Sequence, residues 1–271
     1  MSRYVIGIGA QKAGTSWLAD YLSHHTQVYM SPIKELHYFD AVYTPNLSND
    51  DGMRQRLRAL AALNLRQKTY NVRRAKMLSA LADRVAFRSL ADYRAYFEAR
   101  SGKKQIYCEI TPSYAVLDED GFAAMRKLAD DVRLIFLIRD PVDRFWSAAR
   151  MHAKNQNIPV QSLDALKLLD SPQFVFRANY QRTLDAARKV FSPEQVHVEF
   201  YEKLFTPEAI RKINSFIGIE YMEPDFQKEI NKGEMADMPA HTLEIARQKL
   251  DGIYLWTRAQ YGDQVPLAWR N

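Results

Sequence analysis

YVIGIGAQKAGTSWL, residues 4–18, is the stretch from which the architecture of this chain is best predicted. A short apolar run ends in Gly9, a loop follows that contains Gly14, and apolar residues then recur at helical spacing. This order predicts a strand, a loop and a helix, with Thr15 or Ser16 as the N-cap of the helix.

The rest of the chain repeats this alternation of strands and helices. The clearest strand is 133–138, which is apolar throughout its centre, as expected for a strand covered on both faces. Further strands are predicted at 28–30, 105–110 and 196–200, and helices at 118–128, 141–152, 179–190, 207–217 and 242–261. Strands that alternate with helices predict an α/β fold with a parallel sheet, here as a single domain over residues 1–271.

The composition excludes several classes of protein. The chain has 271 residues, of which 47% are hydrophobic, so a disordered or collagen-like protein is excluded. Cys108 is the single cysteine and no Cys/His cluster is present to bind zinc, so a reducing compartment is expected. No apolar stretch approaches the roughly 18 residues that a membrane span needs. We therefore expect a cytoplasmic protein without an integral membrane segment and without a bound metal.

Positive charge is concentrated in one segment. The net charge is +6, but residues 54–104 alone carry 14 Lys and Arg against three acidic residues. Residues 53–100 contain neither proline nor glycine, which predicts a helical basic insertion at about 50–104. Two interpretations stay open: the segment binds an anionic partner, or it forms a solvated helical face.

The loop between Gly9 and Ser16 has the composition of a phosphate-binding loop. Its backbone N–H groups, together with the N-terminus of the following helix, form a cradle for phosphate oxygens. In the nucleoside-triphosphate P-loop a lysine follows the second glycine, whereas here Thr15 takes that place and Lys12 lies inside the loop. A lysine in the loop can still reach a phosphate oxygen, but the changed position implies a different leaving group.

Four stretches together resemble the sulfotransferases that use 3′-phosphoadenosine 5′-phosphosulfate (PAPS). Residues 11–18, QKAGTSWL, are similar to their 5′-phosphosulfate loop, and residues 133–147 to their 3′-phosphate-binding strand and helix. Residues 34–40, KELHYFD, and 109–114, EITPSY, resemble the acceptor-side segments of bacterial and glycosaminoglycan-type members. The resemblance implies a P-loop-like three-layer fold, PAPS as cosubstrate, adenosine 3′,5′-bisphosphate (PAP) as product, and an activity of class EC 2.8.2.-.

The resemblance also implies which residues hold the donor. Lys12 would stabilise the negative charge that builds on the departing 5′-phosphate. Arg139 and Ser147 would bind the 3′-phosphate, although pairing of Arg139 with Asp140 or Asp143 is the structural alternative. The full set of donor-binding residues is Gln11, Lys12, Ala13, Gly14, Thr15, Ser16, Trp17, Arg139 and Ser147, with Lys232 and Gly233 from a later loop.

The acceptor side requires a base, because the pKa of a hydroxyl lies far above neutrality. The resemblance assigns this role to Glu35, and His37 is the alternative because its ordinary pKa is the most suitable. Lys34 would orient the acceptor or the sulfuryl oxygens, and Tyr38, Phe39 and Tyr114 would form an aromatic wall for a sugar or phenolic ring. Glycosaminoglycan-type members commonly carry lysine where this chain has Ile110, which argues against heparan-like chains.

The predicted function is therefore transfer of a sulfuryl group from PAPS to a hydroxyl, and secondarily to an amine, of a carbohydrate or small-molecule acceptor that can be anionic. A first rival is a P-loop kinase or NTPase, but Arg139 directly precedes the acid that would bind magnesium. A second rival is a nucleic-acid-binding protein using the basic insertion, which lacks any recognised nucleic-acid motif. The sequence does not indicate whether the protein is a monomer or an oligomer.

Overall fold

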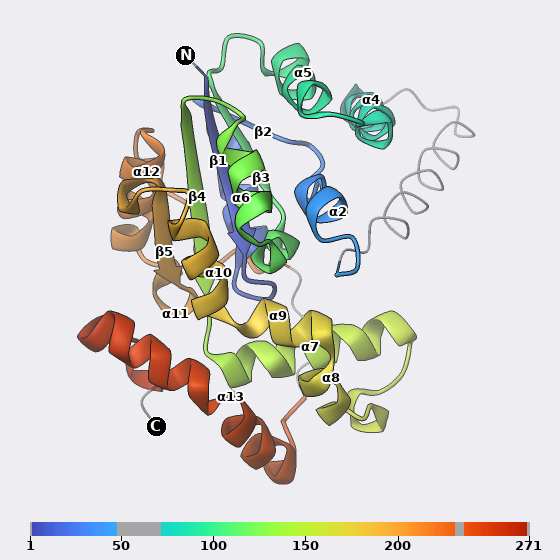
Figure 1. The fold of residues 1–271 in the computed structure, drawn as a ribbon, viewed down its shortest axis with the longest axis vertical. Coiled ribbons are helices and arrows are strands. Elements are labelled where there is room, and N and C mark those ends of the chain that lie inside the picture. Colours follow the sequence, from blue (N-terminus) through green and yellow to red (C-terminus); the bar gives the residue numbers. More distant parts are fainter. Residues whose placement is uncertain (1, 48–71, 231–235, 270–271) are drawn as a thin grey trace.

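The computed structural model describes residues 2–47, 72–230 and 236–269, and its centre is a five-stranded sheet in which every pairing is parallel (Figure 1). The strand order is β2-β3-β1-β4-β5. This confirms the predicted α/β class with a central parallel sheet. The strands are β1 (Arg3–Gly9), β2 (Val28–Met30), β3 (Ile106–Ile110), β4 (Asp131–Ile138) and β5 (Val196–Phe200).

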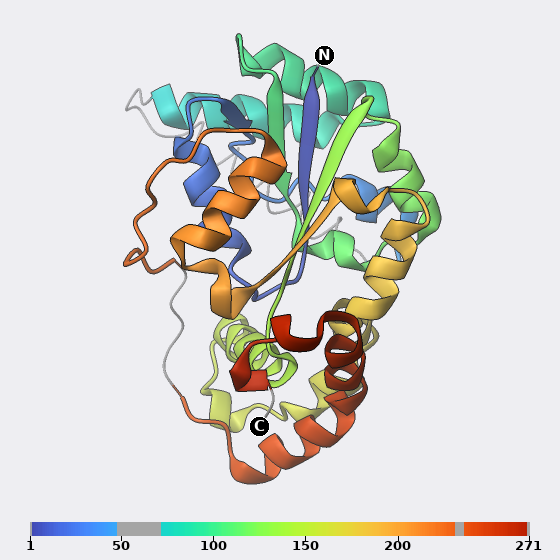
Figure 2. The same cartoon turned by 90° about the vertical axis from the view of Figure 1, so that its left-hand side faces the viewer.

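Helices cover both faces of this sheet. Figures 1 and 2 show α1 and α12 on one face and α5, α6 and α10 on the other. The helices of the described residues are α1 (Thr15–His24), α2 (Phe39–Tyr43), α4 (Val72–Ala86), α5 (Leu90–Ser101), α6 (Glu119–Arg126), α7 (Pro141–Gln156), α8 (Leu166–Asp170), α9 (Pro172–Ala178), α10 (Tyr180–Arg188), α11 (Tyr201–Leu204), α12 (Pro207–Ile217) and α13 (Ala240–Tyr261). Each predicted strand and each predicted helix after residue 104 is present within a few residues of its expected ends.

The central strands explain why the sheet can be parallel. Every residue of β4 from Leu134 to Ile138 is buried, because helices pack on both faces. Tyr180 of α10 packs edge-on against Phe136 of β4, with the ring centroids 5.8 Å apart. In the order β2-β3-β1-β4-β5 the chain runs from β1 toward one edge of the sheet and from β4 toward the other, so the direction reverses between these two neighbours. The crevice expected at such a switch point of a parallel sheet lies outside the carboxyl ends of β1 and β4.

The described part of the basic insertion consists of two helices, α4 and α5, rather than one. The break follows Ala86, where Ser89 accepts a hydrogen bond from the Asp92 N–H (3.2 Å) and donates its own N–H to the Asp92 carboxylate (2.9 Å). This reciprocal capping box starts α5 without any proline or glycine. Residues 50–71 of the predicted insertion lie outside the described residues.

The cationic side chains of this insertion are largely used inside the protein. Five of those described donate to main-chain carbonyl oxygens: Arg84 to Leu36 and His37, Arg88 to Val85 and Phe87, Arg94 to Lys127 and Leu128, Arg100 to Tyr96, and Lys104 to His25 and Val28. Arg88 and Arg100 donate within the insertion itself. For Arg84, Arg94 and Lys104 neither of the two interpretations left open by the sequence is adequate, because these three side chains join the insertion to carbonyls of other segments.

No helix in the described part of the chain combines the length and the apolar character needed to cross a lipid bilayer.

The cap of α5 gives a stability prediction. Ser89→Ala removes the acceptor for the Asp92 N–H and should lower the free energy of unfolding by roughly 0.5–2 kcal/mol, measured by urea denaturation. Ser215→Ala, at an exposed position inside α12, is the matched control and should be neutral or slightly stabilising, since alanine is favoured within a helix. Equal stability of Ser89→Ala and the unchanged protein would show that the cap does not hold α5.

Candidate active site

The loop after β1 is shaped by a glycine that no other residue can replace without strain. Gly14 is the N-cap of α1 and has φ of 83°, in the left-handed region. A Cβ atom at this position would lie 2.8 Å from Leu204 Cδ2 and 3.1 Å from Tyr201 Cδ2. No side chain caps α1 and its first turn contains no acidic residue. The loop therefore presents the positive end of the helix toward the crevice.

Lys12 lies in this loop among other cations. Its backbone is also left-handed, with φ of 71°. Burial lowers the pKa of Lys12, and the positive charges of Arg139, Arg150 and Lys34 lower it further. A half-buried cation surrounded by like charge is stabilised by binding an anion.

Arg139 follows β4 and meets the Lys12 loop across the crevice. Its Nη1 donates to the Lys12 carbonyl oxygen (3.2 Å), and its guanidinium lies over the Tyr201 ring, 4.4 Å from the centroid. Its Nε is buried and has no hydrogen-bond partner among the described residues. The ion pair with Asp143 is long, at 3.8 Å, and Asp143 is 64% exposed. Ser147, two turns along α7, is also buried.

Asp140, the other predicted partner of Arg139, has a different task. Its Oδ1 accepts the N–H groups of Val142 (2.9 Å) and Asp143 (3.0 Å) and the hydroxyl of Tyr254 (2.8 Å). Asp140 is therefore the N-cap of α7.

Residues 34–40, called the acceptor-side loop below, carry side chains of alternating charge that contact one another in a row. Lys34 Nζ lies 2.6 Å from Glu35 Oε1, Glu35 Oε2 lies 3.4 Å from His37 Nε2, and His37 Nδ1 lies 2.8 Å from Asp40 Oδ2. Asp40 is fully buried, whereas Glu35 retains an exposed fraction of 36%. Of this row, the Glu35 carboxylate is thus the acidic group that an incoming molecule can reach.

These contacts set the charge of each group. Burial alone would raise the pKa of Glu35, but the hydrogen bond with His37 and the charge of Lys34 lower it to about 2. Burial alone would lower the pKa of His37, but its hydrogen bonds with Asp40 and Glu35 raise it to about 9. At neutral pH Glu35 is ionised and His37 is an imidazolium.

A buried carboxylate fixes this loop to the sheet. Glu109, at the end of β3, accepts hydrogen bonds from the hydroxyls of Tyr93 (2.6 Å), Tyr114 (2.8 Å) and Thr111 (2.9 Å) and from the Leu36 N–H (3.2 Å). Burial raises the pKa of Glu109. Four donors compensate a carboxylate that is 1% exposed.

The predicted aromatic wall is corrected by the structure. Phe39 and Tyr114 are both 0% exposed, and Tyr38 is buried as well. The Tyr114 hydroxyl donates to Glu109 and accepts the Tyr38 N–H (3.1 Å), so this ring supports the loop from below. These three rings belong to the core because apolar packing and a buried acceptor hold them there, and they offer no surface for a sugar or phenol.

Other predicted donor residues are placed as follows. Ala13 and Thr15 are buried at the start of α1, and Gln11 and Ser16 are half-buried beside them. Trp17 is buried, with its ring stacked near Tyr21 and Phe226 at centroid distances of 6.0 and 5.9 Å. Lys232 and Gly233 lie outside the described residues.

Arg177 was not predicted, yet it lies at this site. It comes from α9, its Nη2 donates to Ser113 Oγ (2.9 Å), and its charge acts on the Asp40 and Glu35 carboxylates. Burial lowers the pKa of Arg177. The sequence does contain a signal for α9: Ser171 is a typical N-cap residue, and Pro172 directly after it is typical of the first turn of a helix.

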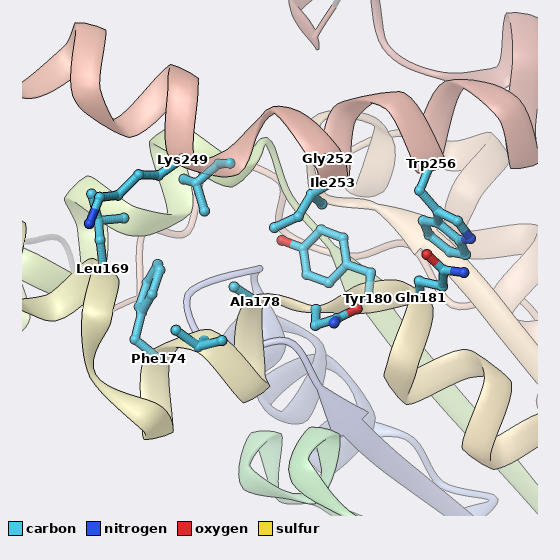
Figure 3. Close-up of a pocket in the computed structure, with 12 residues that line it drawn as sticks. Leu169, Phe174, Ala178, Tyr180, Gln181, Lys249, Gly252, Ile253 and Trp256 are labelled. Atoms are coloured by element: carbon cyan, nitrogen blue, oxygen red, sulfur yellow. The ribbon is translucent and has the colours of Figure 1, made fainter.

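A cavity of about 340 Å³ lies between α13 and the segment that runs from the end of α8 through α9 to the start of α10 (Figure 3). Phe174, Tyr180 and Trp256 are among the residues that line it, and none of the predicted site residues does. Tyr180 links it to Arg139, because the Tyr180 hydroxyl donates to the Arg139 carbonyl (2.7 Å). The cavity is therefore a separate feature of the molecule.

Known proteins resemble this chain both in sequence profile and in fold. A sequence profile described as the sulfotransferase family matches residues 5–224. A comparison with curated proteins finds no significant match.

Among solved structures, a sulfotransferase from Alicyclobacillus acidocaldarius is 22% identical, covers 100% of both chains and superposes with a TM-score of 0.68. The sulfotransferase domain of the Synechococcus PCC 7002 olefin synthase is 17% identical, with a TM-score of 0.52 and coverage of 93% of this chain and 94% of that one. A sulfotransferase domain from the curacin biosynthetic pathway is 15% identical, with the same TM-score and coverage of 89% and 81%. At these identities the likeness shows the shared fold.

The ion-paired histidine gives a pH prediction. Because the pKa of His37 is raised in the folded state to about 9, its contribution to stability is complete below the ordinary pKa of 6.5 and is lost as the pH rises through 9. The stability advantage over His37→Gln should therefore fall between pH 7 and pH 10, by on the order of 1–3 kcal/mol. His241→Gln, at an exposed position in α13, is the control and should show no such pH dependence. A constant difference for His37→Gln would contradict the ion pair.

Proposed function

The chain belongs to the sulfotransferase family, and from this we propose that it moves a sulfuryl group from PAPS to a hydroxyl group of a carbohydrate or small-molecule acceptor. The observation that carries the proposal is the hydrogen bond from Arg139 to the Lys12 carbonyl, which joins two cationic loops at the carboxyl ends of β1 and β4. A donor with phosphates at both its 3′ and 5′ positions matches two neighbouring cations.

The residues of the crevice fit the 3′-phosphate of such a donor. Arg139 has a buried Nε–H that lacks a hydrogen-bond partner among the described residues, and a phosphate oxygen would supply one. Ser147 adds a hydroxyl from α7. The cation over Tyr201 is held in a fixed orientation, which reduces the entropy lost on binding.

The 5′ end of the donor fits the loop of Lys12. The cradle depends on Gly14, whose missing side chain lets the backbone approach, and on the N–H groups of Thr15 and Ser16 at the start of α1. Lys12 supplies the charge. When the bond between sulfur and the bridging oxygen breaks, that oxygen becomes part of the 5′-phosphate of PAP, and Lys12 stabilises its new negative charge.

Glu35 is the proposed base. In the transfer step the acceptor oxygen forms a bond to sulfur, the bond from sulfur to the bridging oxygen breaks, and the hydroxyl proton passes to Glu35. The acceptor oxygen becomes strongly acidic as its bond to sulfur forms, so a carboxylate with a pKa near 2 is basic enough to accept the proton at that stage. Its exposed side then allows the proton to reach solvent.

His37 is less suited to this role. It is already protonated at neutral pH, and both of its ring nitrogens face carboxylates. Its proposed task is to keep Glu35 ionised and oriented, while Asp40 holds the imidazolium from the other side.

The surroundings of Glu35 favour an acceptor with a negative or strongly polar group. Lys34 lies 2.6 Å from the carboxylate and the charge of Arg177 acts on it, and neither residue belongs to the donor loops. Ile110, in place of a cation, keeps the neighbouring strand end apolar. An alcohol is favoured over an amine, because an amine would be protonated at neutral pH.

The magnesium-nucleotide alternative receives no support from the site. Asp140, the acid that would bind the metal, already accepts two backbone N–H groups and one hydroxyl. Within the described part of the chain, no three His, Cys, Asp or Glu side chains are grouped so that they could hold a metal ion.

Donor binding can be tested by thermal unfolding with added nucleotides. PAP should raise the melting temperature, whereas ATP with Mg²⁺ should not; the reverse result would refute the proposal. Lys12→Ala should weaken the PAP-dependent shift and lower kcat with PAPS by roughly 10²–10³-fold, because the charge on the leaving group loses its partner. Lys167→Ala, 84% exposed, is the control and should behave like the unchanged protein.

The base is tested by Glu35→Gln. This variant should bind PAP within about twofold of the unchanged protein, while kcat falls by roughly 10²–10⁴-fold, because the amide cannot accept the hydroxyl proton. Glu119→Gln, an exposed glutamate of α6, is the matched control. Full activity of Glu35→Gln together with loss of activity in His37→Ala would mean that the base is His37.

A further inference from the structure

One arginine of the basic insertion reaches the acceptor-side loop. Arg84 lies near the end of α4 and is 1% exposed. Its Nε donates to the Leu36 carbonyl and its Nη2 to the His37 carbonyl (2.7 Å). A guanidinium can hold two neighbouring carbonyls at once because its N–H groups form a planar fork.

The backbone that Arg84 holds is an unfavourable one. His37 has φ of 50°, in the left-handed region, which costs a residue with a Cβ atom on the order of 1–2 kcal/mol. This conformation turns the imidazole between Glu35 and Asp40. The orientation of the peptide group after His37 depends on this φ angle. The hydrogen bond from Arg84 to the His37 carbonyl holds that peptide group in place.

The other side of the loop is held by the sheet. The Leu36 N–H donates to Thr111 Oγ1 (2.9 Å) and to Glu109, and the Ile110 N–H donates to the Lys34 carbonyl (3.2 Å). These anchors fix where the loop lies. The carbonyls of Leu36 and His37 are not used by these anchors, and they accept hydrogen bonds from Arg84.

The insertion makes a second connection to the same loop. Tyr93 of α5 donates its hydroxyl to Glu109 Oε1 (2.6 Å), and the opposite oxygen of that carboxylate accepts the Leu36 N–H. The insertion therefore holds the carbonyls of this segment directly, through Arg84 of α4, and its Leu36 N–H indirectly, through Tyr93 of α5 and the Glu109 carboxylate.

We propose that Arg84 is a positioning residue that holds the Glu35–His37 pair in its active arrangement through the Leu36 and His37 carbonyls. This inference rests on the proposed function, because it assigns to the basic insertion the task of supporting the base of that reaction. Without Arg84, the His37 peptide relaxes toward the right-handed region. The imidazole then leaves the space between the two carboxylates.

The insertion supplies its own control. Arg94 of α5 makes the same kind of bonds, donating to the Lys127 and Leu128 carbonyls. Those carbonyls belong to the turn before β4, at the edge of the sheet opposite the carboxyl ends. Arg94→Met therefore removes an equivalent pair of hydrogen bonds away from the loop.

The experiment compares the pH dependence of kcat in Arg84→Met and Arg94→Met with that of the unchanged protein. The plateau of the unchanged protein should be wide, since the pKa values of Glu35 and His37 are about 2 and 9. In Arg84→Met the plateau should narrow from both ends, toward the ordinary values of about 4.3 and 6.5. The maximal kcat should fall roughly 10–100-fold, with PAP affinity within about twofold. Arg94→Met should keep the wide profile.

Arg84→Lys keeps the charge but loses the planar fork, so its pH profile of kcat should lie between those of Arg84→Met and the unchanged protein. PAP binding shows whether Arg84→Met is folded. If Arg84→Met does not bind PAP, Arg84→Lys replaces it in the comparison. A wide profile and unchanged kcat in a PAP-binding Arg84 variant would overturn the inference. Glu35→Gln separates the two proposals. If Glu35→Gln is fully active the base itself is misassigned, whereas its inactivity combined with an unaltered Arg84 profile refutes only the role of Arg84.

Discussion

The parallel sheet imposes the constraint on which the site depends, because it brings every strand's carboxyl end to one edge. β1 and β4 are parallel neighbours at which the strand order reverses, so the loops that follow them lie next to each other at this edge. Arg139 bonds the Lys12 carbonyl there. Two half-buried cations placed this close repel each other, and the lowered pKa of Lys12 reflects both its partial burial and this repulsion. Under the proposed function, an anionic donor would relieve this repulsion, so the geometry that is unfavourable in the free protein would favour binding.

The acceptor side solves the opposite problem, which is to keep a carboxylate ionised beside other acids. Lys34 and the His37 imidazolium flank Glu35, and Asp40 balances the imidazolium from the core. The loop that carries these groups is tied to β3 through Glu109 and to the basic insertion through Arg84. Part of the positive charge concentrated in the insertion thus has a structural use: Arg84 and Arg94 donate to carbonyl oxygens of segments outside the insertion.

The elements with a local pattern could be predicted from the sequence. β4 is apolar along its length, and the loop around Lys12 has glycine, lysine and hydroxyl residues in order, so both were recognisable. The positions that depend on packing were not. Phe39 and Tyr114 read as an exposed aromatic wall but are core residues, because their environment is set by strands far away in the chain. Likewise the carbonyls reached by Arg84, and the approach of Arg177 to Glu35, follow from how helices dock and leave no periodic trace in the sequence.

Sulfuryl transfer itself is tested most directly by following the label from PAPS that is radiolabelled in its sulfuryl group, in the presence of a panel of sugars, phenols, lipids and amines. For the proposed reaction the label should move to a hydroxyl-bearing acceptor, with one PAP released for each group transferred. Label that appears only as inorganic sulfate, at a rate that no acceptor changes, would contradict it.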